Sequence, residues 1–239
     1  MEIKVRAITL KSVDYKDSDK ILTLFTLERG KITVSARGVR KSGAKFRAIA
    51  EPFCFADVVL AGKGGRYTVK EMTAVDTFYP LITDMKKYYA GFCALEFAAA
   101  FSQEELVAEE LFVRLVSFLK DLCYGDAAAE DLLIKFFHDA LKTEGYSISF
   151  SGCGRCGCEI ERKVFLSLSG GYCVCEKCRA TGEKEFSIKT YGYLRRTVSG
   201  EGVYDAALAA NALRFFGYYM AEATGVTLRS LTALVNGDK

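Results

Sequence analysis

Apolar and polar residues alternate with a period of two through the first third of the chain. The alternation covers residues 3–7 and 31–37, and three further β-prone runs cover 21–27, 53–60 and 66–72. Glycine-rich turns separate several of these segments. Such alternation is typical of strands that have one buried face. Residues 1–80 are therefore predicted to form five short strands.

Five strands in a segment of this length match the strand count of an oligonucleotide-binding (OB) barrel. An SH3-like barrel or a simple meander would give much the same pattern. We predict the α+β fold class, with a five-stranded OB-type β-barrel at residues 1–80 that serves as a nucleic-acid-binding domain.

The hydrophobic period changes to 3.6 after Pro80, and a helical domain is predicted for residues 81–239. The expected helices cover 82–101, a segment from 102, 127–144, 187–198, 204–224 and 228–235. Residues 102–105 read Ser-Gln-Glu-Glu, the form of a capping box, and are expected to open the second helix. Gly145 and Gly225 are the expected C-terminal caps.

Aromatic residues form a stripe on the helix expected at 204–224. They are Phe215, Phe216, Tyr218 and Tyr219. Their spacing favours a place in the hydrophobic core over a cofactor site.

Two Cys-x-x-Cys pairs interrupt the helical domain, in a module predicted at residues 150–182. The pairs are Cys153 with Cys156 and Cys175 with Cys178. The 18 residues between them include the β-prone run 163–169 and a Gly-Gly turn, so a hairpin is expected to bring the pairs together. Four cysteines at this spacing predict one tetrahedral Zn²⁺ site. Four thiolates leave no open position, which makes the predicted zinc structural rather than catalytic.

Cys158 and Cys173 lie close enough in sequence to replace one of the four ligands. A disulfide cluster or a set of buried free thiols would also fit the composition. Disulfides need an oxidising compartment, and residues 1–6 carry no apolar signal segment. No apolar run reaches the length of a membrane helix. We therefore expect a soluble, cytoplasmic protein.

Charge is distributed unevenly along the chain, although the net charge is only +3. Residues 1–80 contain 15 lysine and arginine residues against 9 aspartate and glutamate residues, whereas residues 81–239 contain 18 against 21. This asymmetry indicates a polyanionic partner for the N-terminal part.

Basic residues are concentrated between positions 29 and 50, a stretch without any acidic residue. The predicted phosphate-binding residues are Arg37, Arg40 and Lys41, with Lys31, Lys45 and Arg47 as a second tier. The part around Gly38 to Gly43 is expected to be a flexible loop between the third and fourth strands that follows a phosphate backbone, with Phe46 able to stack on a base. The alternative is a solvated loop that only maintains solubility.

No catalytic constellation is evident, and no enzymatic activity is expected. His138 is the only histidine, and the sequence offers it no clear acid–base partner or nucleophile. A thiol enzyme that uses Cys158 or Cys173 would need a thiolate of lowered pKa.

Several segments together resemble the RecO family of bacterial recombination mediators. They are Asp19-Lys20-Ile21-Leu22-Thr23 leading to Arg29-Gly30-Lys31, Ala36-Arg37-Gly38-Val39-Arg40-Lys41-Ser42, Glu51-Pro52-Phe53, Cys153-x-x-Cys156-Gly157, and Gly170-Gly171 before Cys175-x-x-Cys178. The resemblance covers nearly the whole chain.

This resemblance implies a non-enzymatic, nucleoid-associated protein that binds single- and double-stranded DNA and anneals complementary strands. It also implies help in loading RecA onto DNA coated by the single-stranded-DNA-binding protein (SSB), with RecR as a partner. The acidic, phenylalanine-ended SSB tail is expected on the helical domain, where Arg195, Arg196 and Arg214 are available cations. The alternative hypothesis is a zinc-containing protein-interaction adaptor whose basic loop is incidental.

Overall fold

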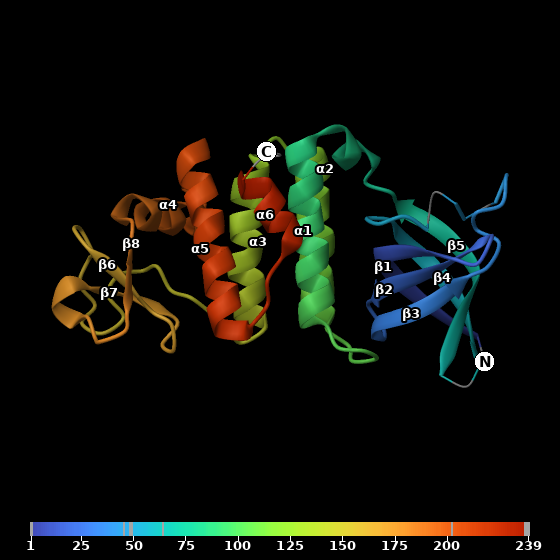
Figure 1. The fold of residues 1–239 in the computed structure, drawn as a ribbon, viewed down its shortest axis with the longest axis horizontal. Coiled ribbons are helices and arrows are strands. Elements are labelled where there is room, and N and C mark those ends of the chain that lie inside the picture. Colours follow the sequence, from blue (N-terminus) through green and yellow to red (C-terminus); the bar gives the residue numbers. More distant parts are fainter. Residues whose placement is uncertain (1, 45, 48–49, 64, 202, 237–239) are drawn as a thin grey trace. The chain divides into compact units, whose positions relative to one another are not determined.

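A closed barrel of five strands occupies the N-terminal part of the chain in the computed structural model (Figure 1), which describes residues 2–44, 46–47, 50–63, 65–201 and 203–236. The strands are β1 (Glu2–Tyr15), β2 (Asp19–Thr26), β3 (Gly30–Ala36), β4 (Phe55–Lys63) and β5 (Arg66–Asp76). Their order around the barrel is β1-β2-β3-β5-β4. The predicted five-stranded OB-type barrel is confirmed.

The long strand β1 closes the barrel by pairing with two neighbours. Its first half pairs antiparallel with β4, from Glu2 to Ile8, and its second half pairs antiparallel with β2, from Ala7 to Tyr15. On the other side, β3 and β5 join through a short parallel pairing. Closure therefore depends on contacts between segments that are far apart in sequence.

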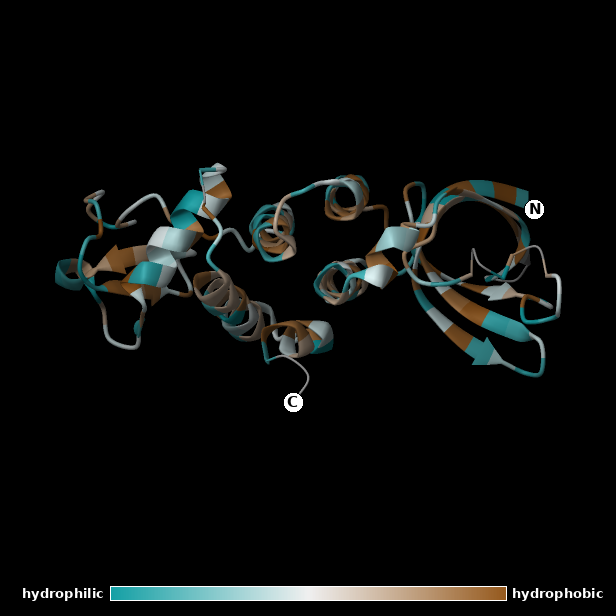
Figure 2. Cartoon of the chain, turned by 90° about the horizontal axis from the view of Figure 1, so that it is seen from above, coloured by the Kyte–Doolittle hydropathy of each residue, from teal (hydrophilic) through white to brown (hydrophobic). Residues whose placement is uncertain are grey.

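Alternate residues of the strands fill the interior of the barrel. Leu22, Leu24, Ile32 and Val34 are almost completely buried, as the period-two pattern predicted. Figure 2 shows the matching bands of hydrophobic and hydrophilic residues along the strands. Burial of these aliphatic side chains stabilises the barrel, since each contributes about 1.5–3 kcal/mol when removed from water.

Two helices pack with the barrel in one compact unit that spans residues 1–125. After the short 3₁₀ turn η1 (Tyr79–Thr83) come α1 (Met85–Phe101) and α2 (Glu109–Tyr124). The ring centroid of Phe112 on α2 lies 5.5 Å from that of Phe25 on β2. The sequence predicted a domain boundary near residue 80, where strands give way to helices, and that boundary stays a prediction.

The segment expected to open the second helix instead ends the first one. Ser102 is the C-terminal cap of α1, and its hydroxyl donates to the carbonyl of Ala98. The following residues lie along β3, where Glu105 N–H donates to Lys31 O at 3.0 Å. The capping-box prediction was therefore wrong, because the edge of β3 takes the backbone hydrogen bonds that a helix would have used.

The second compact unit spans residues 126–239 and contains the remaining helices. They are α3 (Ala129–Thr143), α4 (Ile188–Ser199), α5 (Ala206–Thr224) and α6 (Arg229–Asn236). The aromatic stripe of α5 is largely core, since Phe215, Phe216 and Tyr219 are buried. Tyr218 is only half-buried. Among the described residues, no helix is both long and apolar enough to span a bilayer.

A small three-stranded sheet is inserted between α3 and α4. It comprises β6 (Val164–Ser167), β7 (Tyr172–Cys175) and β8 (Lys184–Phe186), with the 3₁₀ turn η2 (Glu176–Cys178) after β7. Gly171 turns the hairpin at φ +64°, where a Cβ atom would lie 2.3 Å from the carbonyl oxygen of Ser147. The predicted hairpin and the insertion of a four-cysteine module in the helical region are confirmed.

Candidate nucleic-acid interface and metal centre

The basic connection, residues 37–54 between β3 and β4, starts at a fixed backbone turn. Gly38 has φ +66°, and its N–H donates to Oδ1 of Asp19 at 2.7 Å. This hydrogen bond is the largest influence on Asp19, and it holds the pKa of that carboxyl group below its ordinary value. The nearby Arg37 charge acts in the same direction.

The far end of the basic connection is attached to the same strand β2. Lys20 Nζ forms an ion pair with Oε1 of Glu51, and the lysine side chain is 14% exposed. Between the two ends, Val39 and Ala50 are buried in the barrel core. The two ends of the basic connection are thus attached to the barrel by Val39, Ala50 and the adjacent Asp19 and Lys20. The flexible loop expected around Gly38 to Gly43 stays a prediction.

Four of the six predicted phosphate-binding residues lie exposed in the basic connection. They are Arg37, Arg40, Lys41 and Arg47. Lys45 lies outside the described residues. Within the described part of the chain, no acidic side chain forms an ion pair with Arg37, Lys41 or Arg47. These three cations can therefore face a polyanion without first losing a partner.

Arg40 differs because it already contacts the hairpin between β1 and β2. Its guanidinium lies 3.2 Å from Oδ2 of Asp14 and donates to the carbonyl of Lys16 at 3.2 Å. Both partners belong to the barrel, and both charged side chains are partly exposed, at 38% for Arg40 and 57% for Asp14. An exposed pair of this kind is weak, so a phosphate group can compete with Asp14 for Arg40.

Lys31 lies apart from the other cations. It stands near the start of β3, six residues before Arg37, which is about 20 Å along an extended strand. Its ammonium group donates to the carbonyl of Ala99, in the last turn of α1, at 2.7 Å. A cation at that end of a helix stabilises the helix dipole. The structure thus gives Lys31 a local structural contact.

Phe46 is not a free stacking surface. Its ring is partly buried against the aliphatic core of the barrel. The sequence predicted that Phe46 could stack on a base, because it lies beside the basic loop. Its packing follows from the attachment of the basic connection to the barrel, which local composition does not reveal.

Four thiols converge in the inserted module. The Sγ atoms of Cys153, Cys156, Cys175 and Cys178 all lie within 4.8 Å of one another. The Sγ atoms of Cys156 and Cys175 are 3.9 Å apart. Tetrahedral Zn²⁺ with Zn–S bonds of about 2.3 Å needs sulfur–sulfur separations of about 3.8 Å. The donor set and its spacing fit one tetrahedral metal ion.

Backbone geometry favours the thiolate at two of the four sulfurs, whereas hydrogen bonds with Cys156 and Cys175 raise the pKa of Cys178 to about 12. Burial opposes ionisation of Cys153, but the backbone around Cys175, Cys156 and Arg155 lowers its pKa to about 6. The pKa of Cys175 is also lowered, with hydrogen bonding to the backbone of Cys178 outweighing burial. Because the thiolate is the form that binds metal, the backbone prepares these sulfurs for an ion.

Cys158 and Cys173 do not belong to the four-sulfur cluster. Cys173 is fully buried on β7, and burial raises the pKa of its thiol to about 12. Cys158 is exposed beside the cluster, and hydrogen bonds with Cys156 and Cys175 raise its pKa to about 12. Neither thiol has the lowered pKa that a nucleophilic cysteine needs.

Side-chain contacts hold the two Cys-x-x-Cys pairs of the cluster next to each other. Arg155, within the first Cys-x-x-Cys pair, donates to the carbonyl of Cys178 and to both carboxylate oxygens of Glu183. Gly154 lies against the ring of Tyr172, where a Cβ atom would be 2.4 Å from the ring. Both spacer residues of the first pair, Gly154 and Arg155, therefore contact the part of the module that carries the second pair.

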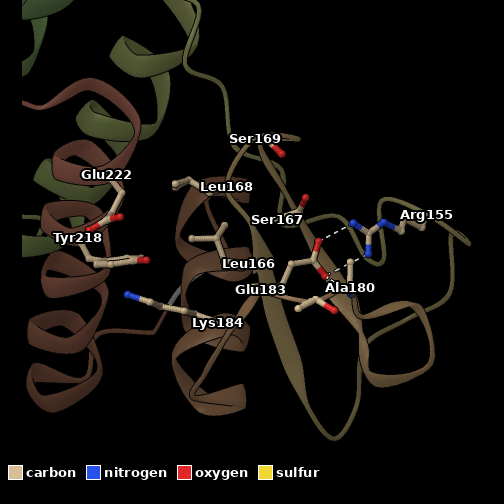
Figure 3. Close-up of a pocket in the computed structure, with 12 residues that line it drawn as sticks. Arg155, Leu166, Ser167, Leu168, Ser169, Ala180, Glu183, Lys184, Tyr218 and Glu222 are labelled. Atoms are coloured by element: carbon tan, nitrogen blue, oxygen red, sulfur yellow. Dashed lines mark hydrogen bonds and ion pairs between the residues drawn. The ribbon is translucent and has the colours of Figure 1, made fainter.

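Two hollows in the described part of the second unit are lined by charged side chains. Figure 3 shows the first, of about 440 Å³, between the small sheet and α5. There Arg155 pairs with Glu183, and Lys184 Nζ lies 4.5 Å from the ring centroid of Tyr218, with Glu222 also lining the hollow. Its charges are balanced internally, so it has no strong preference for an anion.

The second hollow, a cleft of about 550 Å³, is lined mainly by α3, α4 and residues 147–151. Ile148 and Phe150 line it but are only 2% and 3% exposed, its cations are Lys142, Arg195 and Arg196, and Glu201 belongs to the same lining. Arg195 is paired with Glu159 at 2.7 Å. The predicted cations Arg195 and Arg196 therefore lie at one cleft, whereas Arg214 donates to Asn211 and to the carbonyl of Val235.

The architecture defines an OB-barrel protein whose helical region carries a four-thiol module. Residues 1–78 match the family model "Recombination protein O N terminal", and residues 82–232 match "Recombination protein O C terminal". The chain therefore belongs to the RecO family of DNA repair proteins.

Curated relatives named DNA repair protein RecO agree with the family models. The protein of Clostridium novyi is 35% identical over 197 residues, which cover 80% of this chain and 75% of the relative. That of Geobacter sulfurreducens is 33% identical over 207 residues, covering 85% and 83%. That of Streptomyces coelicolor is 32% identical over 209 residues, covering 84% of each chain.

Proposed function

We propose that this protein is a non-enzymatic recombination mediator that binds single- and double-stranded DNA and anneals complementary strands. In this role it assists RecA loading on SSB-coated DNA, with RecR as a partner. The observation that carries the proposal is the exposure of Arg37, Arg40, Lys41 and Arg47 in one basic connection attached to an OB barrel. Membership of the RecO family supports the same role.

Annealing requires two polyanions to be held close together, and no bond has to be made or broken. Cationic side chains displace condensed counterions from each strand, which lowers the repulsion between the strands. Contact with phosphates alone carries no base sequence, as annealing of arbitrary complementary strands requires. If three to five phosphates are neutralised, log affinity for a single strand should fall with log salt at a slope of roughly −2 to −3.5.

The decisive variant replaces Arg37, Arg40 and Lys41 by glutamine. We expect its salt slope to be shallower by about 2 and its affinity at about 0.1 M salt to fall roughly 100-fold, because three counterion-releasing contacts are lost. Annealing should fall with affinity. Fluorescence anisotropy with an unstructured oligonucleotide measures both the slope and the affinity.

The matched control replaces three exposed lysines on helices, Lys120, Lys135 and Lys189, by glutamine. It removes the same charge and should keep more of the affinity and slope. Equal losses in both triple variants would reject the basic connection as the DNA site. Weak, salt-independent binding by the unmodified protein would favour the protein-interaction adaptor.

We propose further that Cys153, Cys156, Cys175 and Cys178 hold one structural Zn²⁺. Bound zinc would cross-link the two halves of the module and add its binding free energy to folding. Metal analysis of protein purified without added metal should find about one zinc per chain. A chain that retains no zinc, or retains another metal, would contradict this assignment.

The cleft beside α3 and α4 is the site that we propose for the SSB tail. An acidic peptide that ends in phenylalanine needs cations for its carboxylates and an apolar surface for its ring. Lys142 and Arg196 supply exposed cations here, and the largely buried side chains of Ile148 and Phe150 form the apolar part of the lining. Lys142→Glu with Arg196→Glu should weaken binding of a labelled tail peptide at least tenfold. Lys135→Glu with Lys189→Glu is the control, and equal effects would reject the cleft.

A further inference from the structure

Tyr15 is an exposed aromatic residue beside the basic connection. It is the last residue of β1, and its side chain is 46% exposed. Sequence reasoning placed a base-stacking role on Phe46, whose ring is packed against the barrel core instead. The basic connection has cations on its surface, but the ring suited to a base belongs to the adjacent hairpin.

Contacts made by Arg40 join Tyr15 to the basic connection. Its guanidinium contacts the Asp14 carboxylate and the Lys16 carbonyl, which flank Tyr15 in sequence. The Arg40 backbone N–H also donates to the carbonyl of Ser18 at 2.9 Å. Three contacts from one residue therefore hold the hairpin tip against the cationic surface.

A lysine ammonium group also lies near the ring of Tyr15. Lys16 has φ +54°, and its Nζ lies 5.3 Å from the ring centroid of Tyr15. An exposed ring, an adjacent ammonium group and the exposed cations of the basic connection are the components of a stacking site for an unpaired base. A duplex keeps its bases stacked on one another, so it cannot use such a ring in the same way.

Two other exposed tyrosines of this unit, Tyr79 and Tyr124, lie near the end of β5, where the Tyr124 hydroxyl donates to Asp76. Tyr79 is 65% exposed and follows β5 by a few residues. The register pairs Ile8 on β1 with Phe55 and Phe55 with Asp76, so the end of β5 lies beside Ile8. Tyr15 is seven residues further along β1, about 23 Å in an extended strand.

We propose that Tyr15 stacks on an unpaired base of the bound strand and makes the interface prefer single-stranded over double-stranded nucleic acid. This inference rests on the proposed DNA-binding function of the basic connection. The cations hold the phosphates of either form, and the ring adds a contact that only an unstacked base can make.

The chain contains no tryptophan, which allows a direct test. Tyr15→Trp places the chain's single indole, which can be excited selectively, in the proposed site, and Tyr79→Trp places it at the other level of the barrel. We expect an unstructured oligonucleotide to quench the indole at position 15 strongly and to leave the indole at position 79 nearly unchanged. Equal quenching in the two variants, or none at position 15, would overturn the inference.

Tyr15→Ala should lower affinity for the single strand on the order of 5- to 100-fold, the range for loss of one stacked base. Affinity for a duplex should change less, and the salt slope should be the same as in the unmodified protein because no charge is removed. Tyr15→Phe should retain the affinity. An unchanged single-strand affinity in Tyr15→Ala would overturn the inference.

Failure of the stacking inference is distinct from failure of the proposed function. If the unmodified protein binds the oligonucleotide with the expected salt slope but Tyr15 has no effect, only the stacking inference fails. If the unmodified protein does not bind, the proposed function itself fails. If Tyr15→Ala lowers the melting temperature, Tyr79→Ala serves as the control. Its affinity shows how much binding is lost when a tyrosine of the barrel unit is removed away from the proposed stacking site.

Discussion

The basic connection and the four-cysteine module are both organised around polar groups, but they are held in different ways. The basic connection is attached to the barrel by buried Val39 and Ala50 and by hydrogen bonds and ion pairs at its two ends. The module has a small sheet and places four sulfurs within 4.8 Å. We therefore expect the basic connection to keep its conformation without a ligand, and the module to gain stability from an ion that neutralises its thiolates.

The largest expected effect follows from removing one sulfur ligand. Cys156→Ser should abolish retention of one metal ion per chain and lower the melting temperature of the second unit, because metal binding contributes directly to folding. Metal analysis and calorimetry measure these changes. DNA affinity of the barrel should change little, which separates the two regions.

The control for this variant is Cys158→Ser, which removes an exposed thiol beside the cluster. It should keep the metal and the melting temperature. Loss of metal from Cys158→Ser, with retention in Cys156→Ser, would mean that Cys158 is a ligand in place of Cys156.

The next effect distinguishes a predicted cation that stabilises the fold from one that contacts DNA. Lys31→Gln should lower the free energy of unfolding by about 1 kcal/mol, since it removes a charged hydrogen bond at the end of α1. Lys41→Gln should instead lower DNA affinity without changing stability. Chemical denaturation and oligonucleotide titration of both variants test the contrast, and a larger affinity loss in Lys31→Gln would reverse it.

A smaller effect is expected from releasing Arg40 from its carboxylate partner. Asp14→Asn should raise affinity for DNA by about 2- to 5-fold, because an exposed ion pair is worth no more than about 1 kcal/mol. Asp17→Asn removes the same charge from the adjoining turn, and among the described residues the carboxylate that pairs with Arg40 is that of Asp14, not Asp17. Equal gains in both variants would show that only net charge matters.

The smallest effect concerns the pH dependence of stability at Asp19. The pKa of Asp19 is lowered in the folded protein. The ionised carboxylate therefore stabilises the fold at pH values above 3.8, the ordinary pKa of this group. That contribution is lost as pH falls through the lowered pKa. The stability difference between the unmodified protein and Asp19→Asn should therefore be present at neutral pH and disappear in acid, as followed by denaturation at several pH values.

Local sequence patterns determined the features that depend on neighbouring residues. Strand alternation predicted the buried faces, and the two Cys-x-x-Cys pairs predicted the four-sulfur cluster, because a short spacer directs both sulfurs to one side. The positions of α3 and α5 followed from their apolar period and their glycine caps. These signals are strong because the interactions are short-range along the chain.

Tertiary structure decided the features that depend on competition between distant segments. The residues after Ser102 pair with β3 instead of opening a helix, and Phe46 packs against the barrel although its neighbours are charged. The attachment of Arg40 to the hairpin that carries Tyr15 likewise depends on residues more than 20 positions apart. Composition gives the number of charged and aromatic residues, but only the closed barrel determines which of them lie on the same surface.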